Sequence, residues 1–417
     1  MKTIKESASA AKAASAEVAH LSTDTKNAAL LTMAEALVED KEKIIAANAR
    51  DMKAAKERGT SDALLDRLAL NEKRIADMAE GIRQIAALPD PVGEIIDSWV
   101  TADGLRIKKV RVPMGVIGII YEARPNVTAD AAALAFKAGS SILLRGSASA
   151  YESNAAIVSS LRRALTSHGI CPDAVCLVED NNREAVSEML RMREYIDVII
   201  PRGGASLIKN AVENSTVPVI ETGVGNCHVY VDESADYDMA ENIVVNAKTQ
   251  RPGVCNAEET LLVHKKWAEK YLGRLLSKLV SLGVELHGDE ISRSFCDAVI
   301  PATDDDWAEE YLSLKMAVRV VDDVREAVAH INKYRTKHTE CIVTSSPESE
   351  VAKYFKETVD AAAVNVNAST RFTDGFMYGF GAEIGISTQK LHARGPMGLR
   401  EITSYKYIVE GDGQIRK

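Results

Sequence analysis

The chain has 417 residues, which is too many for a single hydrophobic core, so two or three domains are expected. Its hydrophobic content of 46% and charged content of 27% are typical of a soluble globular protein. The net charge of -9 argues against a nucleic-acid partner, which usually needs a basic face, but a local arginine cluster could still bind a small anionic substrate.

The six cysteines are scattered, with no CxxC pair and no Cys/His cluster at zinc spacing. We therefore expect reduced thiols, a cytoplasmic protein and no metal site. No apolar run approaches the roughly 20 residues that span a bilayer. The Ala/Ser-rich first 20 residues lack a continuous apolar segment, so they predict an amphipathic helix rather than a secretory signal, and no membrane partner is expected.

Residues 2–88 have helical periodicity throughout. Asn71 is a plausible N-cap for the last helix, and Pro89 ends it. Residues 99–101 and 105–112 then predict a β-hairpin around Asp103 and Gly104. A two-stranded ribbon is marginally stable by itself, so we expect it to pair with the Tyr/Ile-rich strand at 404–409 or with another subunit.

Short apolar segments alternate with helical ones from Gly115 to Ile220. Strands are expected at 115–121, 142–145, 174–178, 196–200 and 217–220, and helices at 128–138, 154–168, 183–192 and 203–212. Because these strands are apolar without alternation, they predict a doubly wound α/β domain that binds its ligand at the carboxyl ends of the strands. The GxGxxG fingerprint of dinucleotide-binding proteins is absent.

A second α/β block follows. Strands are expected at 229–231, 260–263, 316–321, 341–344 and 361–366, and helices at 239–247, 267–282 and 324–334. Within this block Pro252 and Gly253 break regular structure just before Cys255, so a turn holds a thiol at the start of a strand. Lys248 and Arg251 lie close by in sequence, and nearby cations favour the nucleophilic thiolate. A free cysteine is nevertheless more often a small buried hydrophobe.

Four loops at predicted carboxyl ends of strands carry chemistry-capable residues. They are 122–126, 145–147, 201–206 and 221–226. The third is a glycine-rich turn into a helix, which suits an anion or pyrophosphate. One such loop alone is weak evidence because glycine turns after strands are common. Four on successive strands, followed by the Cys255 turn, indicate a cofactor that faces a thiol.

At this point the order of motifs resembles the aldehyde dehydrogenase superfamily. Residues 221–226 are similar to its Glu-Leu-Gly-Gly-Lys segment, 250–263 to its nucleophile segment, and 309–312 to its Glu-Glu-Ile-Phe segment; Phe380 and Gly381 stand near its Phe-Gly-Gly turn. The segments GVIGIIYEARPNVTADA, PRGGASLI, IETGVGNCHVYVD and KTQRPGVCNA resemble the branch that reduces an acyl phosphate of glutamate in proline biosynthesis.

The resemblance implies a fold with a doubly wound cofactor domain, a second α/β catalytic domain and a small β flap for oligomerisation. The expected cofactor domain is 1–98 with 113–228 and 375–400, the catalytic domain is 229–374, and the flap is 99–112 with 401–417. It also implies NADPH-dependent reduction of L-glutamyl 5-phosphate to L-glutamate 5-semialdehyde through a Cys255 thioester. A homo-oligomer is expected, and the upstream glutamate kinase is a candidate partner.

The resemblance assigns roles to residues of this chain. The expected catalytic residues are Cys255, Asn126 and Glu221. The expected cofactor-binding residues are Arg145, Ser147, Arg202, Gly203, Gly204, Ser206 and Glu310. The expected substrate-binding residues are Arg124, Arg251, Asn367, Ser369, Thr370 and Arg371, with Arg394 as a further candidate.

Two departures from the family pattern leave alternatives open. Residues 123–126 replace the Pro-Trp-Asn oxyanion motif, and an ungapped alignment places Arg124 rather than Asn126 at the asparagine, so the Cys255 backbone N–H is a third candidate donor. Where NAD-preferring members carry a ribose-binding acid, this chain has Arg145-Gly146-Ser147, which favours NADPH.

Two rival functions share these residues. One is a hydrolytic aldehyde dehydrogenase, in which Glu221 would activate water; the other is a non-catalytic nucleotide-binding protein on the same fold. Fold alone does not separate them.

Overall fold

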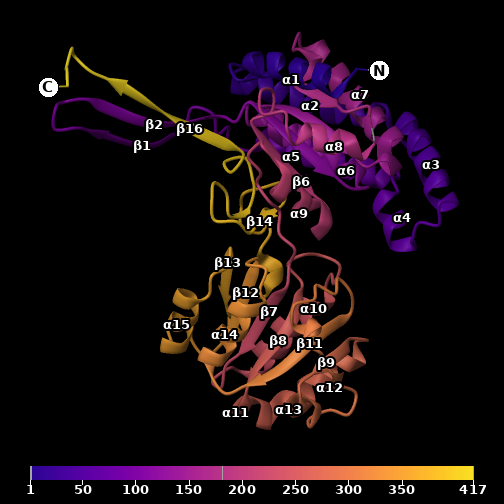
Figure 1. The fold of residues 1–417 in the computed structure, drawn as a ribbon, viewed down its shortest axis with the longest axis vertical. Coiled ribbons are helices and arrows are strands. Elements are labelled where there is room, and N and C mark those ends of the chain that lie inside the picture. The colour runs from indigo at the N-terminus through magenta and orange to yellow at the C-terminus, as the bar shows by residue number, and fades with distance from the viewer. Residues whose placement is uncertain (1, 181, 417) are drawn as a thin grey trace. The chain divides into compact units, whose positions relative to one another are not determined.

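The computed structural model describes residues 2–180 and 182–416, which form two compact units (Figure 1). Unit 1 comprises residues 1–222, 379–385 and 397–417, and unit 2 comprises residues 223–378 and 386–396. Each unit contains its own parallel sheet, as expected for a chain of this length. The fold is that of a mixed α/β protein.

Unit 1 begins with five helices, which cover the region predicted to be helical. They are α1 (Ile4–Val18), α2 (Thr23–Glu39), α3 (Lys41–Glu57), α4 (Asp62–Leu68) and α5 (Glu72–Ala87). Side-chain caps mark the starts of some of these helices: Thr3 forms a capping box with Glu6 before α1, and Ser22 accepts from the backbone N–H of Thr25 before α2. Asn71 caps α5 through the Arg74 N–H, which confirms the predicted N-cap.

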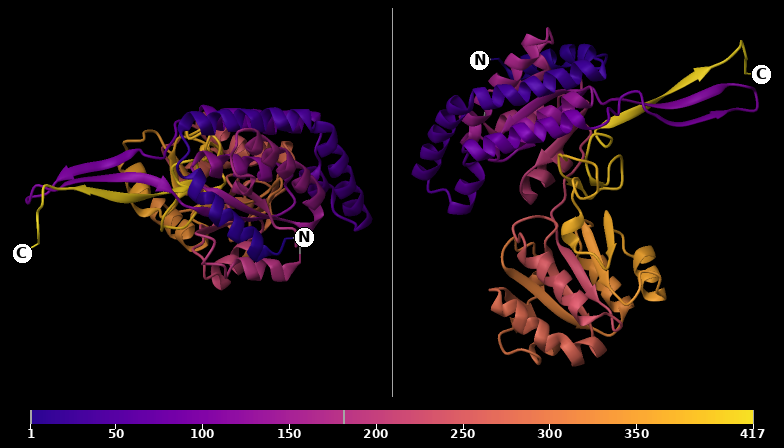
Figure 2. Two further views of the ribbon diagram at one scale, coloured as in Figure 1. Left: turned by 90° about the horizontal axis from the view of Figure 1, so that it is seen from above. Right: turned by 180° about the vertical axis from the view of Figure 1, so that it is seen from behind.

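The sheet of unit 1 has four parallel strands in the order β5-β4-β3-β6. The strands are β3 (Val116–Tyr121), β4 (Ser141–Gly146), β5 (Val175–Leu177) and β6 (Val198–Arg202). The helices that follow them are α6 (Pro125–Lys137), α7 (Tyr151–Ser167), α8 (Arg183–Met189) and α9 (Ala205–Asn214). Helices α1 and α8 pack on one face, and α6 and α7 cover the other, with α2 and α5 outside them (Figures 1 and 2). The predicted doubly wound arrangement is confirmed.

The strand predicted at 217–220 is wrong. Only an isolated bridge forms there, between Ile199 and Val219. The ladder does not extend because the next hydrogen bonds on either side would need the N–H groups of residues 201 and 218, and both are prolines. The Ser215 hydroxyl accepts from the Val217 N–H just before this segment.

A three-stranded antiparallel ribbon extends from the body of unit 1 (Figures 1 and 2). It consists of β1 (Ile95–Val100), β2 (Arg106–Pro113) and β16 (Thr403–Glu410) in the order β1-β2-β16. The predicted pairing of the last strand with the hairpin is confirmed, with Thr403 opposite Pro113 and Glu410 opposite Arg106. Trp99 and Tyr407 meet edge to face across β2, with ring centroids 6.1 Å apart.

Unit 2 is built on a seven-stranded parallel sheet in the order β10-β9-β11-β8-β7-β12-β13. The strands are β7 (Cys227–Val231), β8 (Glu258–His264), β9 (Glu285–Gly288), β10 (Ile300–Pro301), β11 (Lys315–Val321), β12 (Thr339–Val343) and β13 (Ala363–Val366). Helices α10 (Tyr237–Thr249) and α12 (Gly273–Ser281) pack on one face, and α14 (Val324–Tyr334) and α15 (Glu350–Thr358) pack on the other. Both faces are therefore buried, as the apolar strands predict.

Several small elements differ from the sequence prediction. The helix expected at 267–282 consists of α11 (Lys265–Trp267), a π-helical turn at Ala268–Leu272 and α12. The short strands β9 and β10, β14 (Ile386–Ser387) and β15 (Gly395–Pro396), and helices α13 (Glu290–Arg293) and α15 were not predicted. Among the described residues, none of the helices has the length and apolar character that a membrane crossing requires.

Candidate active site

Cys255 lies in the turn between α10 and β8, and this turn is held from behind by hydrogen bonds. The side chain of Cys255 is half-buried, whereas Asn256 is buried. The amide of Asn256 donates to the carbonyl of Thr373 at 2.9 Å, and the hydroxyl of Thr370 donates to the carbonyl of Asn256 at 2.7 Å. The predicted turn is confirmed, and these bonds give the thiol a fixed support.

The backbone of Gly225 passes directly beside the carbonyl of Cys255. A Cβ at Gly225 would overlap that carbonyl oxygen, so no residue larger than glycine fits without a shift of the turn. Two residues after Gly225, at the start of β7, the Cys227 thiol donates to the same carbonyl at 3.2 Å. Burial raises the pKa of Cys227 well above its usual value, so this second thiol is not a competing nucleophile.

Two arginines supply positive charge near the nucleophile. The Nε of Arg371 donates to the Gln250 side chain at 2.8 Å, which places the guanidinium over the end of α10. Burial lowers the pKa of Arg371, the neighbouring Arg251 lowers it further, and Cys255 acts in the opposite direction. Arg371 thus interacts with both Arg251 and Cys255, and by reciprocity its positive charge favours the thiolate of Cys255.

The predicted substrate residues at 367–370 mainly shape the loop that carries Arg371. Asn367 adopts a left-handed conformation with φ of 55°, and its side-chain oxygen accepts from the Thr344 N–H at 2.9 Å. Ser369 is buried, and its hydroxyl accepts from the Arg371 N–H at 3.3 Å. Together with Thr370 these side chains position the loop, and they stay proposed as substrate contacts. Arg394 pairs with Asp360 at 2.8 Å.

Glu310 also belongs to this part of unit 2. Its carboxylate accepts from the Gly225 N–H at 2.6 Å, and Gly225 in turn contacts Cys255. Burial raises the pKa of Glu310, while the Gly225 hydrogen bond lowers it. The structure thus brings together Cys255, Arg251, Arg371 and Glu310, which come from three separate stretches of sequence.

In unit 1 the glycine-rich loop after β6 contacts the loop after β3. Gly204 is the N-cap of α9, and its N–H donates to the carboxylate of Glu122 at 3.0 Å. A Cβ at Gly203 would lie 2.7 Å from Cδ of Glu122, so a larger residue there would require the Glu122 side chain to move. Ser206 is exposed in the first turn of α9, and Arg202 is half-buried at the end of β6. These residues form a helix N-terminus that can receive an anion.

The loop after β4 carries the other predicted cofactor residues. Arg145 donates to the carbonyl of Asn182 at 2.8 Å, and burial lowers its pKa while Asp180 raises it. Ser147 caps a short 3₁₀ turn by accepting from the Ser149 N–H at 3.3 Å. The Arg145 guanidinium is therefore anchored on one side by a backbone carbonyl.

The loop after β3 leads into α6, with Pro125 at its first turn. Arg124 is exposed there, and the amide of Asn126 donates to Asp130 at 3.2 Å within the helix. Burial raises the pKa of Asp130 to about 6. Glu221 is half-buried at the end of unit 1, next to Thr222, whose hydroxyl donates to the carbonyl of Pro201 at 2.7 Å.

Two acidic residues beside the Cys255 turn, Glu258 and Glu259, were not predicted to take part in the site, and the role of one lysine was misjudged. Glu122 lies in the predicted loop 122–126, but its contact with Gly204 was not foreseen. The Lys248 ammonium was expected to act on the thiolate, but it is buried and pairs with Glu259 at 2.6 Å. Two consecutive acids at the start of an apolar strand were the available signal, because charged residues are almost never fully buried without a partner.

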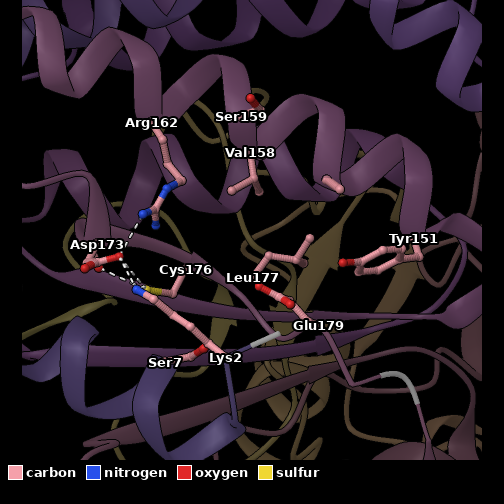
Figure 3. Close-up of a pocket in the computed structure, with 11 residues that line it drawn as sticks. Lys2, Ser7, Tyr151, Val158, Ser159, Arg162, Asp173, Cys176, Leu177 and Glu179 are labelled. Carbon is pink, nitrogen blue, oxygen red and sulfur yellow. Dashed lines mark hydrogen bonds and ion pairs between the residues drawn. The ribbon is translucent and has the colours of Figure 1, made fainter.

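A cavity of about 320 Å³ lies elsewhere in unit 1, beside edge strand β5 (Figure 3). Its wall includes Lys2 and Arg162, which both pair with Asp173, at 3.3 Å and 2.8 Å. Tyr151 and Glu179 line its other end. Among the described residues that line it, none is a predicted catalytic, cofactor-binding or substrate-binding residue.

Comparison with known proteins gives a consistent result. A model of the aldehyde dehydrogenase family matches residues 1–314. A γ-glutamyl phosphate reductase of Moorella thermoacetica is 59% identical over 407 residues, which cover 98% of this chain and 97% of the relative. One of Caldanaerobacter subterraneus is 56% identical over 99% of this chain and 100% of the relative.

Solved structures agree with these relatives. The crystal structure of a γ-glutamyl phosphate reductase from Thermotoga maritima is 52% identical, covers 100% of both chains and has a TM-score of 0.97. An acetylating aldehyde dehydrogenase from Geobacillus thermoglucosidasius is only 18% identical, with a TM-score of 0.68 over 99% of this chain and 97% of that one, and so shows the shared fold alone.

Proposed function

The chain belongs to the aldehyde dehydrogenase family and, within it, to the γ-glutamyl phosphate reductases; from this membership we propose that it reduces L-glutamyl 5-phosphate to L-glutamate 5-semialdehyde with NADPH. It is an oxidoreductase of proline biosynthesis. The observation that carries the proposed chemistry is the Cys255 thiol, held in a supported turn beside two arginines.

In the proposed mechanism the Cys255 thiolate attacks the γ-carbonyl carbon of the acyl phosphate. A C–S bond forms, the C–O bond to the phosphate breaks, and inorganic phosphate leaves with that electron pair. The result is a thioester on Cys255. Bound NADPH would supply the hydride that reduces this thioester, after which the C–S bond breaks and the aldehyde departs from the regenerated thiolate.

Protein groups have defined tasks in this reaction. Arg251 and Arg371 favour the thiolate and are proposed to hold the anionic groups of the substrate, with Arg124 as a further candidate. The developing oxyanion needs a donor, for which we propose Asn126 and the Cys255 backbone N–H. Water takes no part in the forward reaction, so Glu221 has no water to activate. We propose that its role is to accept the proton of the Cys255 thiol.

The residues of unit 1 fit a dinucleotide. Helix α9 begins after its N-cap Gly204, which has no capping side chain, so the N–H groups of the first turn can bind a pyrophosphate, in competition with the Glu122 carboxylate at the Gly204 N–H. Arg145 and Ser147 stand where NAD-preferring relatives carry an acid, which supports NADPH over NADH. Comparison of KM for the two cofactors tests this, and a clear preference for NADH would contradict it.

The decisive experiment is oxidation of L-glutamate 5-semialdehyde with NADP, with and without phosphate. The proposed enzyme requires phosphate, whereas a hydrolytic aldehyde dehydrogenase does not. Cys255→Ser should abolish turnover while NADPH binding and the circular dichroism spectrum are retained. Retained turnover in that variant would refute the thioester mechanism, and absence of any turnover in the wild type would favour a non-catalytic nucleotide-binding protein.

We further propose that the ribbon β1-β2-β16 is an oligomerisation element. Every residue of β1 is exposed, and Val100 and Val409 expose 67% and 54% of their surface. Exposed apolar side chains on edge strands are typical of surfaces that another chain covers. Val100→Lys with Val409→Lys should lower the mass found by sedimentation equilibrium.

A complex with the upstream glutamate kinase stays a separate proposal, testable by co-sedimentation.

A further inference from the structure

A buried ion pair lies behind the Cys255 turn. The ammonium of Lys248, near the end of α10, donates to the carboxylate of Glu259 on β8 at 2.6 Å, and both side chains are completely buried. Replacing such a pair by apolar residues is often neutral or stabilising, because two charges must be removed from water. Stability alone therefore gives little reason for this pair to be present.

A β-bulge brings Glu259 into this position. On β7 Cys227 pairs with Glu258 and His228 pairs with Thr260, so Glu259 is an extra residue in β8. Bulges re-aim side chains and are over-represented next to active sites. Glu259 lies four residues after the nucleophile Cys255, and the bulge directs its carboxylate to Lys248.

The other oxygen of Glu259 binds the loop at residues 309–312. The Leu312 N–H donates to Oε1 of Glu259 at 3.3 Å, and the Lys248 ammonium lies 6.0 Å from the centre of the Tyr311 ring. Leu312 has a φ of 52°, a left-handed conformation that persists only where the surroundings enforce it. The Tyr311 hydroxyl donates to Asp306 at 2.7 Å, which fixes the same loop from another side.

This loop carries Glu310, whose carboxylate accepts from the Gly225 N–H at 2.6 Å. Gly225 contacts the carbonyl of Cys255. Gly253, in the Cys255 turn, lies close to the 309–312 loop: a Cβ placed on Gly253 would be 3.6 Å from the carbonyl oxygen of Leu312. The 309–312 loop and the Cys255 turn are therefore connected at two points, and the buried pair supports both.

We propose that Lys248 and Glu259 are positioning residues, which fix the 309–312 loop so that Glu310 is held in place for the cofactor beside Cys255. This inference rests on the proposed function for what Glu310 binds, but the support of the loop stands on geometry alone. Neither residue touches the reacting atoms. The prediction is therefore an effect on NADPH binding and on the order of the loop rather than loss of the chemical step.

Glu259→Gln is the first test, and its neighbour offers a matched control. The substitution keeps the shape and one acceptor oxygen but removes the charge that binds Lys248. Glu258 is equally buried on the same strand, and among the described residues its carboxylate has no hydrogen-bond partner. Glu259→Gln should raise KM for NADPH about tenfold with a smaller change in kcat, because misplacement of a supporting group is costly. Glu258→Gln should leave both constants within about twofold of wild type.

Hydrogen exchange at the Leu312 amide provides a readout that does not depend on activity. It should be faster in Glu259→Gln than in Glu258→Gln. If Glu259→Gln does not fold, Lys248→Met with Glu259→Leu carries the test, since it leaves no uncompensated buried charge. The proposal would be overturned if the Leu312 amide of Glu259→Gln exchanged at the wild-type rate. It would also be overturned if exchange were faster but KM for NADPH were unchanged. If the wild type lacks NADPH-dependent reduction, the proposed function fails, while exchange at Leu312 and the alkylation rate of Cys255 still decide whether the pair holds the loop.

Discussion

The carboxylate of Glu122 accepts a hydrogen bond from the N–H of Gly204 at the first turn of α9, at 3.0 Å. An acid thus lies at the helix terminus where a pyrophosphate is expected to bind. Acidic groups are stabilised at helix N-termini for the same reason that phosphates are, so the two compete for one set of N–H groups.

Glu122→Gln should therefore tighten NADPH binding. Removal of one negative charge at this position is expected to lower Kd by about twofold to fivefold, which corresponds to the usual 0.3–1 kcal/mol of a helix-terminus charge. Fluorescence titration with NADPH measures this, and Glu184→Gln, an exposed acid in the first turn of α8, is the control. Weaker binding in Glu122→Gln would mean that the carboxylate binds the cofactor.

Gly225→Ala should displace the nucleophile. The new Cβ would overlap the Cys255 carbonyl, so the turn must shift, and a shift of about 1 Å can reduce turnover about a hundredfold. Gly253→Ala is the comparison, because its Cβ meets its nearest neighbour at an ordinary 3.6 Å. Steady-state kinetics of the two variants, with thermal unfolding to check the fold, measure the effect. Equal activities would contradict the close approach of Gly225 to Cys255.

Glu258 should make stability depend on pH. Burial raises the pKa of this carboxyl well above its usual value of 4.5, so it stays protonated in the folded protein and ionises on unfolding. Its contribution to stability is therefore complete at low pH and is lost as pH rises above about 4.5, by up to about 1.4 kcal/mol per pH unit.

Glu258→Gln removes this titration because glutamine does not ionise. The variant should gain stability relative to wild type between pH 5 and pH 8 in urea unfolding followed by tryptophan fluorescence. Glu348→Gln, at an exposed position, should show no such gain. A constant difference between Glu258→Gln and wild type over this range would show that Glu258 is ionised in the folded state.

Glu221→Gln should leave phosphate-dependent turnover measurable, since the forward reaction activates no water. We expect a moderate loss of about tenfold, below the roughly 10²–10⁴-fold that a general acid or base contributes, because Glu221 is assigned only the Cys255 proton. The phosphate-dependent oxidation of the semialdehyde measures it. Complete loss would instead make Glu221 essential to the chemistry.

The sequence predicts the parallel sheets well because their strands are short apolar runs such as β3 and β11. Elements that depend on tertiary context are missed. Residues 217–220 look like a strand, but Pro201 and Pro218 lack the N–H groups that would extend the pairing, so only a bridge forms at Val219. The short strand β10 has exposed residues and no periodic pattern, so nothing in its composition marks it.

The same distinction applies to the candidate site. Cys255 and the glycine loops are recognisable because a thiol after Pro-Gly and glycines after strands are local patterns. The pairing of Lys248 with Glu259 depends on a bulge in β8, and a bulge is set by the neighbouring strand β7. A local pattern therefore gave the nucleophile but not the groups that support it.

The ribbon has a consequence for the order of events during synthesis. Strand β16 pairs with β2, yet residues 223–378 of unit 2 are made between them. On the ribosome, β1 and β2 must wait with one edge open until the translated chain reaches residue 403. A nascent polypeptide halted before that point would expose an unpaired hairpin edge, so premature termination should yield an aggregation-prone product rather than a smaller stable protein.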